Sequence, residues 1–277
     1  MKMSRATLTT MFVILFSGLV SAQASYISPS TAISLGSESA ELFTKVEFSS
    51  LDNLRVTADL YDRGDKKKPL IILFHQSGSS RGEYREIAPE LVKLGFNCLA
   101  VDLRWGLKDR KNNIENETAL RYGTPAIFEQ ASKGQREKVW PTIFESRKDM
   151  VAAIRWARQN GYSGKLIIWG ASFSAILVFE IANEHSKEVD GVISYSPGEY
   201  HEERPEMVRT WAGALKQDCY IASGVEEIKI ARPIFDAIPH EKKVFFHASK
   251  GRHGSSILTE DLSNWDELKN FLKRYIV

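Results

Sequence analysis

One stretch decides the fold: Leu166-Ile167-Ile168-Trp169-Gly170-Ala171-Ser172-Phe173-Ser174-Ala175. It begins as an apolar run of strand length and passes through a turn of small residues, and residues 176–181 continue with the spacing of a helix. A serine at such a strand-to-helix turn is forced outward, with its hydroxyl above the sheet edge and its amide near the helix N-terminus. The stretch therefore predicts an outward-facing hydroxyl on Ser172.

This turn is close to the pattern G-x-S-x-G, which carries the nucleophile of serine hydrolases. Here the pattern is Gly170-x-Ser172-x-Ser174, so the second glycine is missing. Glycine at that point lets the helix pack closely on the strand, and we expect the turn to accept the hydroxymethyl group of Ser174. Ser172 is a candidate nucleophile if the rest of the chain supplies its partners.

Two kinds of strand surround this turn. Residues 43–48 and 54–61 alternate apolar and polar side chains, which predicts half-buried antiparallel strands. Residues 69–74, 96–101 and 165–169 are apolar on both faces, as a parallel sheet covered by helices requires. Further strands are predicted at residues 189–195, 218–222 and 243–247, and helices at 87–94, 144–157, 228–238 and 262–276. The alternation predicts an α/β fold with helices on both sides of the sheet.

Residues 106–139 do not fit the alternation, because they are polar with only a few apolar or aromatic islands. A connection of this length is usually a functional cap or a disordered insert. We therefore expect one domain over residues 43–277, with an insertion at 106–139 after the fourth strand.

The N-terminus has the features of a secretory signal. Lys2 and Arg5 precede an apolar stretch over residues 11–20, and Ala22-Gln23-Ala24 matches the small-residue cleavage pattern. We expect residues 1–24 to be a signal peptide, residues 25–42 to be a flexible leader, and the protein to be secreted or periplasmic. The apolar stretch is short for a membrane span, so no membrane association is expected after cleavage.

Charge and cysteine content exclude several classes of partner. Without Lys2 and Arg5, 35 basic residues balance 35 acidic ones, which gives no electrostatic case for nucleic acid. Cys98 and Cys219 both lie in apolar strand-like runs, so we expect inert core residues. No other cluster of metal-ligand residues is visible, and we predict no metal site. Oligomeric state is left open.

A serine nucleophile needs a base. If the three residues follow the chain order serine, acid, histidine, the histidine comes on a loop after the last strand. Of six histidines, His253 lies there, in Lys250-Gly251-Arg252-His253-Gly254-Ser255. The histidine in turn needs a carboxylate. Glu227 is favoured, because it comes three residues after Gly224 at the end of a predicted strand. Glu226 and Glu199 remain as alternative acids.

Acyl transfer also needs amides that point at the developing oxyanion. One would be the amide of Phe173, directly after the serine. The other would come from His75-Gln76-Ser77-Gly78-Ser79-Ser80, where we favour the amide of Ser77 over that of Gln76. We expect His75 to be structural and to hold this loop.

Together these segments resemble the α/β-hydrolase superfamily, and within it the dienelactone-hydrolase-like and esterase-like branch. The resemblance rests on His75-Gln76-Ser77-Gly78, Val101-Asp102-Leu103-Arg104, Gly170-Ala171-Ser172-Phe173-Ser174 and Arg252-His253-Gly254. It implies an eight-stranded, mostly parallel sheet, hydrolysis through an acyl-enzyme, and no cofactor. Dienelactone hydrolases proper use a cysteine nucleophile, so Ser172 favours ordinary ester chemistry.

The expected function is a serine hydrolase acting on small carboxylic esters or lactones. A serine peptidase or amidase and a hydrolase-fold binding protein without turnover are the alternatives. We expect residues 106–139 to set substrate choice, with Gln76, Trp105, Tyr122 and Trp140 as candidate pocket residues. Fold alone does not give the substrate.

Overall fold

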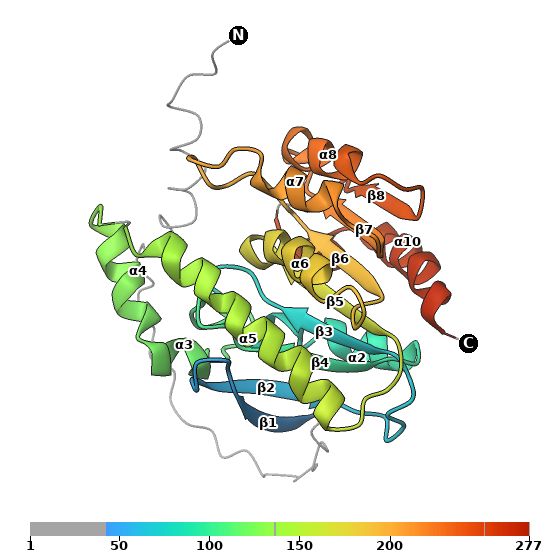
Figure 1. Cartoon of the computed structure of the whole chain (residues 1–277), viewed down its shortest axis with the longest axis horizontal. Helices are drawn as coiled ribbons and strands as arrows, with labels where there is room; N and C mark the ends of the chain where they lie inside the picture. The colour runs from blue at the N-terminus through green and yellow to red at the C-terminus, as the bar shows by residue number, and fades with distance from the viewer. Residues whose placement is uncertain (1–42, 136, 252, 277) are drawn as a thin grey trace, which may run out of the picture.

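A sheet of eight strands runs through the molecule, with helices on both faces (Figure 1). The computed structural model describes residues 43–135, 137–251 and 253–276. The expected signal peptide and leader, residues 1–42, lie outside the described residues.

The strand order is β1-β2-β4-β3-β5-β6-β7-β8. β1 pairs antiparallel with β2, β2 pairs antiparallel with β4, and all other neighbours are parallel. The predicted mostly parallel eight-stranded sheet is confirmed. The strands are β1 (Thr44–Ser49), β2 (Arg55–Tyr61), β3 (Leu70–Phe74), β4 (Asn97–Val101), β5 (Leu166–Ala171), β6 (Gly191–Tyr195), β7 (Asp218–Ser223) and β8 (Lys243–His247).

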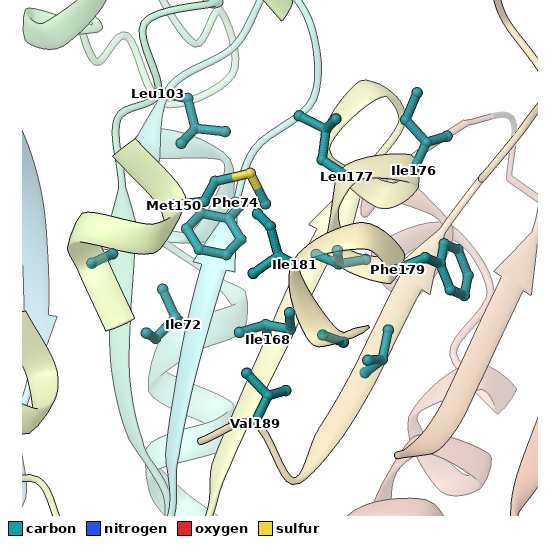
Figure 2. Close-up of a cluster of buried hydrophobic side chains, with 14 of the residues drawn as sticks. Ile72, Phe74, Leu103, Met150, Ile168, Ile176, Leu177, Phe179, Ile181 and Val189 are labelled. Carbon is teal, nitrogen blue, oxygen red and sulfur yellow. The ribbon is translucent and has the colours of Figure 1, made fainter. Parts of the chain in front are cut away.

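Successive side chains of the central strands enter two separate cores. On β3, Ile72 and Phe74 belong to one buried cluster, whereas Ile71 belongs to the other. The first core lies under α5 (Val139–Gln159), α6 (Phe173–Glu184), α7 (Met207–Gly213) and α8 (Ile228–Ala237). Figure 2 shows part of it, where Met150 of α5 and Ile181 of α6 pack over Ile72 and Ile168 of the sheet.

The second core lies on the opposite face. It is covered by η1 (Arg81–Tyr84), α2 (Ile87–Lys93), α9 (Ser256–Glu260), α10 (Ser263–Leu272) and η2 (Lys273–Tyr275). Because both faces are covered, every residue of β3, β4, β5 and β6 is buried. Cys98 and Cys219 are both free and buried in these cores, as expected.

The segment 106–139 is more regular than its sequence indicates. It contains a β-bridge between Asp109 and Ile114 and the helices α3 (Glu117–Tyr122) and α4 (Thr124–Ser132). The Asn116 side chain caps α3 by accepting a hydrogen bond from the Ala119 amide. The described part of the segment is therefore an ordered insertion and not a disordered one. In α3, local capping replaces the apolar periodicity that a sequence pattern detects. Two short helices, α7 and α9, were also not predicted.

Ion pairs of one buried arginine join the chain just before this segment to α5 and to the β1–β2 turn. Arg104 follows β4, is fully buried, and makes two-pronged contacts with Asp149 of α5 and Asp52 of the β1–β2 turn. Its Nη2 lies 2.7 Å from Asp149 Oδ1, and both side chains are inaccessible to solvent. Since α5, the β1–β2 turn and the chain after β4 meet at one guanidinium, Arg104 holds three elements together.

Replacing Arg104 by glutamine should therefore lower the free energy of unfolding by about 3–5 kcal/mol, because Asp149 would be left as an uncompensated buried charge. Chemical denaturation measures this loss. Lys133→Gln is the control, because that lysine pairs with Glu129 on the surface and both side chains are 67% exposed. A change below about 1 kcal/mol in Arg104→Gln would show that the pair is unimportant for folding.

Candidate active site

Ser172 lies at the turn between β5 and α6, with φ 58° and ψ −116°. This left-handed conformation is rare for a residue with a side chain. The turn is tight, because a Cβ on Gly170 would overlap the carbonyl oxygen of Ser174. The Ser172 amide donates a hydrogen bond of 2.9 Å to the carbonyl of Tyr195 at the end of β6. The chain therefore presents the Ser172 side chain at the carboxyl edge of the sheet.

The missing motif glycine has a structural explanation. Ser174 is fully buried, and its Oγ accepts a 2.8 Å hydrogen bond from the Ala171 amide. The same hydroxyl lies 2.8 Å from the Phe74 carbonyl and 3.0 Å from the His75 carbonyl, to which it can donate. Ser174 thus ties the turn of Ser172 to the end of β3, which goes beyond the expectation that the turn merely accepts it.

His253 reaches Ser172 from the loop after β8. Its Nε2 lies 2.7 Å from Ser172 Oγ, and its Nδ1 contacts Glu227 Oε1. A carboxylate has no hydrogen to donate, so Nδ1 carries the hydrogen of the neutral imidazole. Nε2 is then the acceptor for the serine hydroxyl. Gly251 and Gly254 lie on either side of the histidine with φ of 93° and 62°, conformations that glycine adopts without steric cost.

Glu227 follows β7 and immediately precedes α8. Its Oε2 accepts hydrogen bonds from Ser196 Oγ at 2.6 Å and from the Gly224 amide at 3.2 Å. Burial alone would raise the pKa of Glu227, but the hydrogen bond and charge of His253, with the bonds from Ser196 and Gly224, hold it below its usual value. The side chain is therefore a carboxylate at neutral pH.

The two alternative acids, Glu226 and Glu199, lie in other surroundings. Glu226 is exposed to solvent, because one residue of register turns it away from the loop of His253. Both carboxylate oxygens of Glu199 accept hydrogen bonds from the amides of Val208 and Arg209, so this side chain binds the first turn of α7. Among the described residues, neither makes a hydrogen bond to His253.

Ser196 was not identified from the sequence. It lies directly after β6, is fully buried and has φ 56°. Besides donating to Glu227, its Oγ accepts a 2.9 Å hydrogen bond from the amide of Gly254. Ser196 therefore connects the acid to the histidine loop. The available signal was its position at the carboxyl end of a parallel strand adjacent to β5.

The loop of residues 75–80 lies on the other side of Ser172. His75 is fully buried; its Nε2 accepts from the Leu103 amide at 2.9 Å, so its Nδ1–H donates to the Gln76 carbonyl at 2.8 Å. Burial lowers the pKa of His75 to about 4, so it is neutral at pH 7. The Gln76 amide is occupied by the Glu83 carboxylate at 2.8 Å, whereas the Ser77 and Phe173 amides donate to no other group in the described part of the chain.

The candidate pocket residues occupy different surroundings. Trp105 is buried, donates from Nε1 to Ser77 Oγ at 3.0 Å, and stacks on Phe128 of α4 with ring centroids 4.1 Å apart. The ring of Trp140 packs against that of His201, with the ring centroids 4.6 Å apart. The ring of Tyr122 lies instead under the Arg104 guanidinium, at 5.0 Å, and serves the ion-pair cluster.

The side chain of Gln76 approaches the histidine loop so closely that a Cβ on Gly254 would overlap the Gln76 Oε1.

Within residues 43–135, 137–251 and 253–276, no group of three or more His, Cys, Asp or Glu could hold a metal ion. In the same residues, no helix is both long and apolar enough to cross a membrane.

Comparisons with solved structures agree with this architecture. The esterase Pf2001 of Pyrococcus furiosus is 17% identical over 92% of this chain and 100% of its own, with a TM-score of 0.61. A dienelactone hydrolase from Anabaena variabilis is 18% identical over 86% of this chain and 100% of its own, with a TM-score of 0.60. A carboxyl esterase from Bacillus coagulans is 11% identical over 86% of this chain and 100% of its own, with a TM-score of 0.59. At these identities the likeness shows the fold.

No curated protein matches the sequence. The profile of the family described as serine aminopeptidase, S33 matches residues 65–236, which is more than half of the chain and includes β3 to β7 with the turn of Ser172. The chain therefore belongs to the α/β hydrolases, in the family described as serine aminopeptidase, S33.

Proposed function

We propose that the protein is a serine hydrolase that cleaves small carboxylic esters or lactones through an acyl-enzyme on Ser172. The observation that carries the proposal is the chain of contacts from Ser172 Oγ to His253 Nε2, at 2.7 Å, and from His253 Nδ1 to Glu227. This arrangement gives the serine a base and gives the base a fixed tautomer and a counter-charge.

In the proposed reaction, Ser172 Oγ attacks the ester carbonyl while His253 Nε2 takes the hydroxyl proton. Glu227 stabilises the imidazolium that forms. The tetrahedral intermediate collapses as the C–O bond to the alcohol breaks, and His253 returns the proton to the leaving oxygen. Water, deprotonated by His253, then attacks the acyl-enzyme. The bond from the acyl carbon to Ser172 Oγ breaks, His253 returns the proton to that oxygen, and the carboxylic acid is released.

The amides of Ser77 and Phe173 are proposed as the oxyanion donors. Phe173 is the first residue of α6, where an amide has no partner within the helix and the helix dipole favours negative charge. Ser77 lies in a turn closed by the hydrogen bond from the Ser79 amide to the Gln76 carbonyl, 3.2 Å, which leaves the Ser77 amide free. These two free amides support an electrostatic contribution at the developing charge.

Peptide or amide hydrolysis is the second candidate, because the matching family is described as serine aminopeptidase. Neighbours in fold that are esterases favour the ester instead. Comparing kcat/KM for p-nitrophenyl acetate and alanine p-nitroanilide separates the two. We expect the ester to be preferred, and a preference for the anilide would assign the protein to the peptidases.

Ser172→Ala should lower kcat for p-nitrophenyl acetate by about 10⁴-fold or more, since the nucleophile is removed. Steady-state hydrolysis measures the loss, and an unchanged far-ultraviolet circular dichroism spectrum shows that the fold is retained. Substantial activity in the variant would mean that Ser172 is not the nucleophile. A wild-type protein inactive on all esters and amides tried would favour the binding-protein alternative.

Glu227→Gln should lower kcat by about 10²–10⁴-fold, because the amide cannot stabilise the His253 imidazolium. Its neighbour provides a matched control: Glu226→Gln removes an exposed carboxylate one residue away and should leave kcat within about twofold. Equal effects at both positions would contradict the assignment of Glu227 as the acid.

A further inference from the structure

Both peptide groups of Gln76 are held by hydrogen bonds. On one side its amide donates to Glu83 Oε2 at 2.8 Å. On the other side its carbonyl accepts from His75 Nδ1 at 2.8 Å and from the Ser79 amide at 3.2 Å. With both flanking peptide planes fixed, the φ and ψ angles of Gln76 are fixed as well.

This restraint determines where the next amide points. The Ser77 N–H belongs to the same planar peptide group as the Gln76 carbonyl and points away from that oxygen. We propose that Glu83 is a positioning residue, which holds the Gln76 backbone so that the Ser77 amide faces the reacting carbonyl. The inference rests on the proposed function, in which Ser77 supplies one oxyanion donor.

Glu83 is itself firmly anchored. It lies in η1, whose first residue, Arg81, binds Asp59 at 3.0 Å and Asp102 at 2.6 Å. The side chain of Ser80 caps the same turn by accepting from the Gly82 amide. A carboxylate mounted on this buried ion-pair cluster can hold the loop in one geometry. A loop side chain without such support would leave the Ser77 amide free to rotate.

Burial, the largest influence, raises the pKa of Glu83 to about 7. Of the nearby charges, that of Asp109 raises this pKa and that of His253 lowers it. A protonated carboxyl group keeps one oxygen free to accept from the Gln76 amide. A positioning role therefore depends on the reach of the side chain, whereas an electrostatic role toward His253 would depend on its charge. Two variants separate these possibilities.

Glu83→Gln keeps the reach and an acceptor oxygen but removes the charge, and we expect kcat for p-nitrophenyl acetate to stay within about threefold of wild type. Glu83→Asp keeps the charge but withdraws the acceptor by one methylene, and we expect kcat to fall about tenfold or more, with KM within about twofold. The loss falls on kcat because an oxyanion donor acts in the transition state.

The same two substitutions at Glu86 are the matched controls, because that carboxylate pairs on the surface with Lys111, at 2.7 Å, and is 53% exposed. Both should leave kcat unchanged, and melting temperatures establish that all four variants are folded. The reverse order, with Glu83→Gln impaired and Glu83→Asp active, would overturn the positioning role, as would wild-type kcat in both. A wild-type protein without hydrolytic activity would instead overturn the proposed function.

Discussion

The backbone of Ser172 is held at φ 58° and ψ −116°, a conformation that costs a residue with a side chain about 1–3 kcal/mol. Such strain persists only where the surroundings impose it. Here the Ser172 amide is bound to the Tyr195 carbonyl, and the Ser174 hydroxyl joins the turn to the end of β3. Close packing of Gly170 against Ser174 closes the turn from behind. The position of the Ser172 oxygen follows from these contacts, and every other group of the site is placed relative to it.

The parallel sheet brings the remaining groups to the same edge. β3, β5, β6, β7 and β8 run in one direction, so the loops after their carboxyl ends are neighbours although they are far apart in sequence. Hydrogen bonds then join one loop to the next. Ser196 links the acid loop to the histidine loop, and Glu83 links η1 to the loop of residues 75–80. Charged groups below that loop are paired and buried, which makes the edge a rigid platform.

Much of this arrangement could be predicted from the sequence, because continuous apolar strands and a strand-to-helix turn leave strong patterns. Order along the chain predicts Ser172, Glu227 and His253 as partners, and their side chains lie in hydrogen-bonding contact. Chain order works here since parallel topology converts sequence order into spatial order.

Other features left no such pattern. Within the polar segment of residues 106–139, α3 begins at a cap made by the Asn116 side chain, which gives no apolar periodicity. Ser196 and Glu83 act through hydrogen bonds that no spacing rule encodes: Ser196 binds Glu227 and the Gly254 amide, and Glu83 binds the Gln76 amide. The difference between Glu226 and Glu227 is one residue of register, and only the three-dimensional path of the loop after β7 decides it.

The central claim is that Ser172 is a nucleophile activated by its neighbours. Labelling the purified protein with a fluorophosphonate probe, followed by identification of the modified peptide, tests that claim most directly, because the probe bonds covalently only to an activated serine. The account predicts stoichiometric labelling of Ser172 and no labelling of Ser172→Ala. Labelling of another residue, or none in the folded wild-type protein, would contradict it.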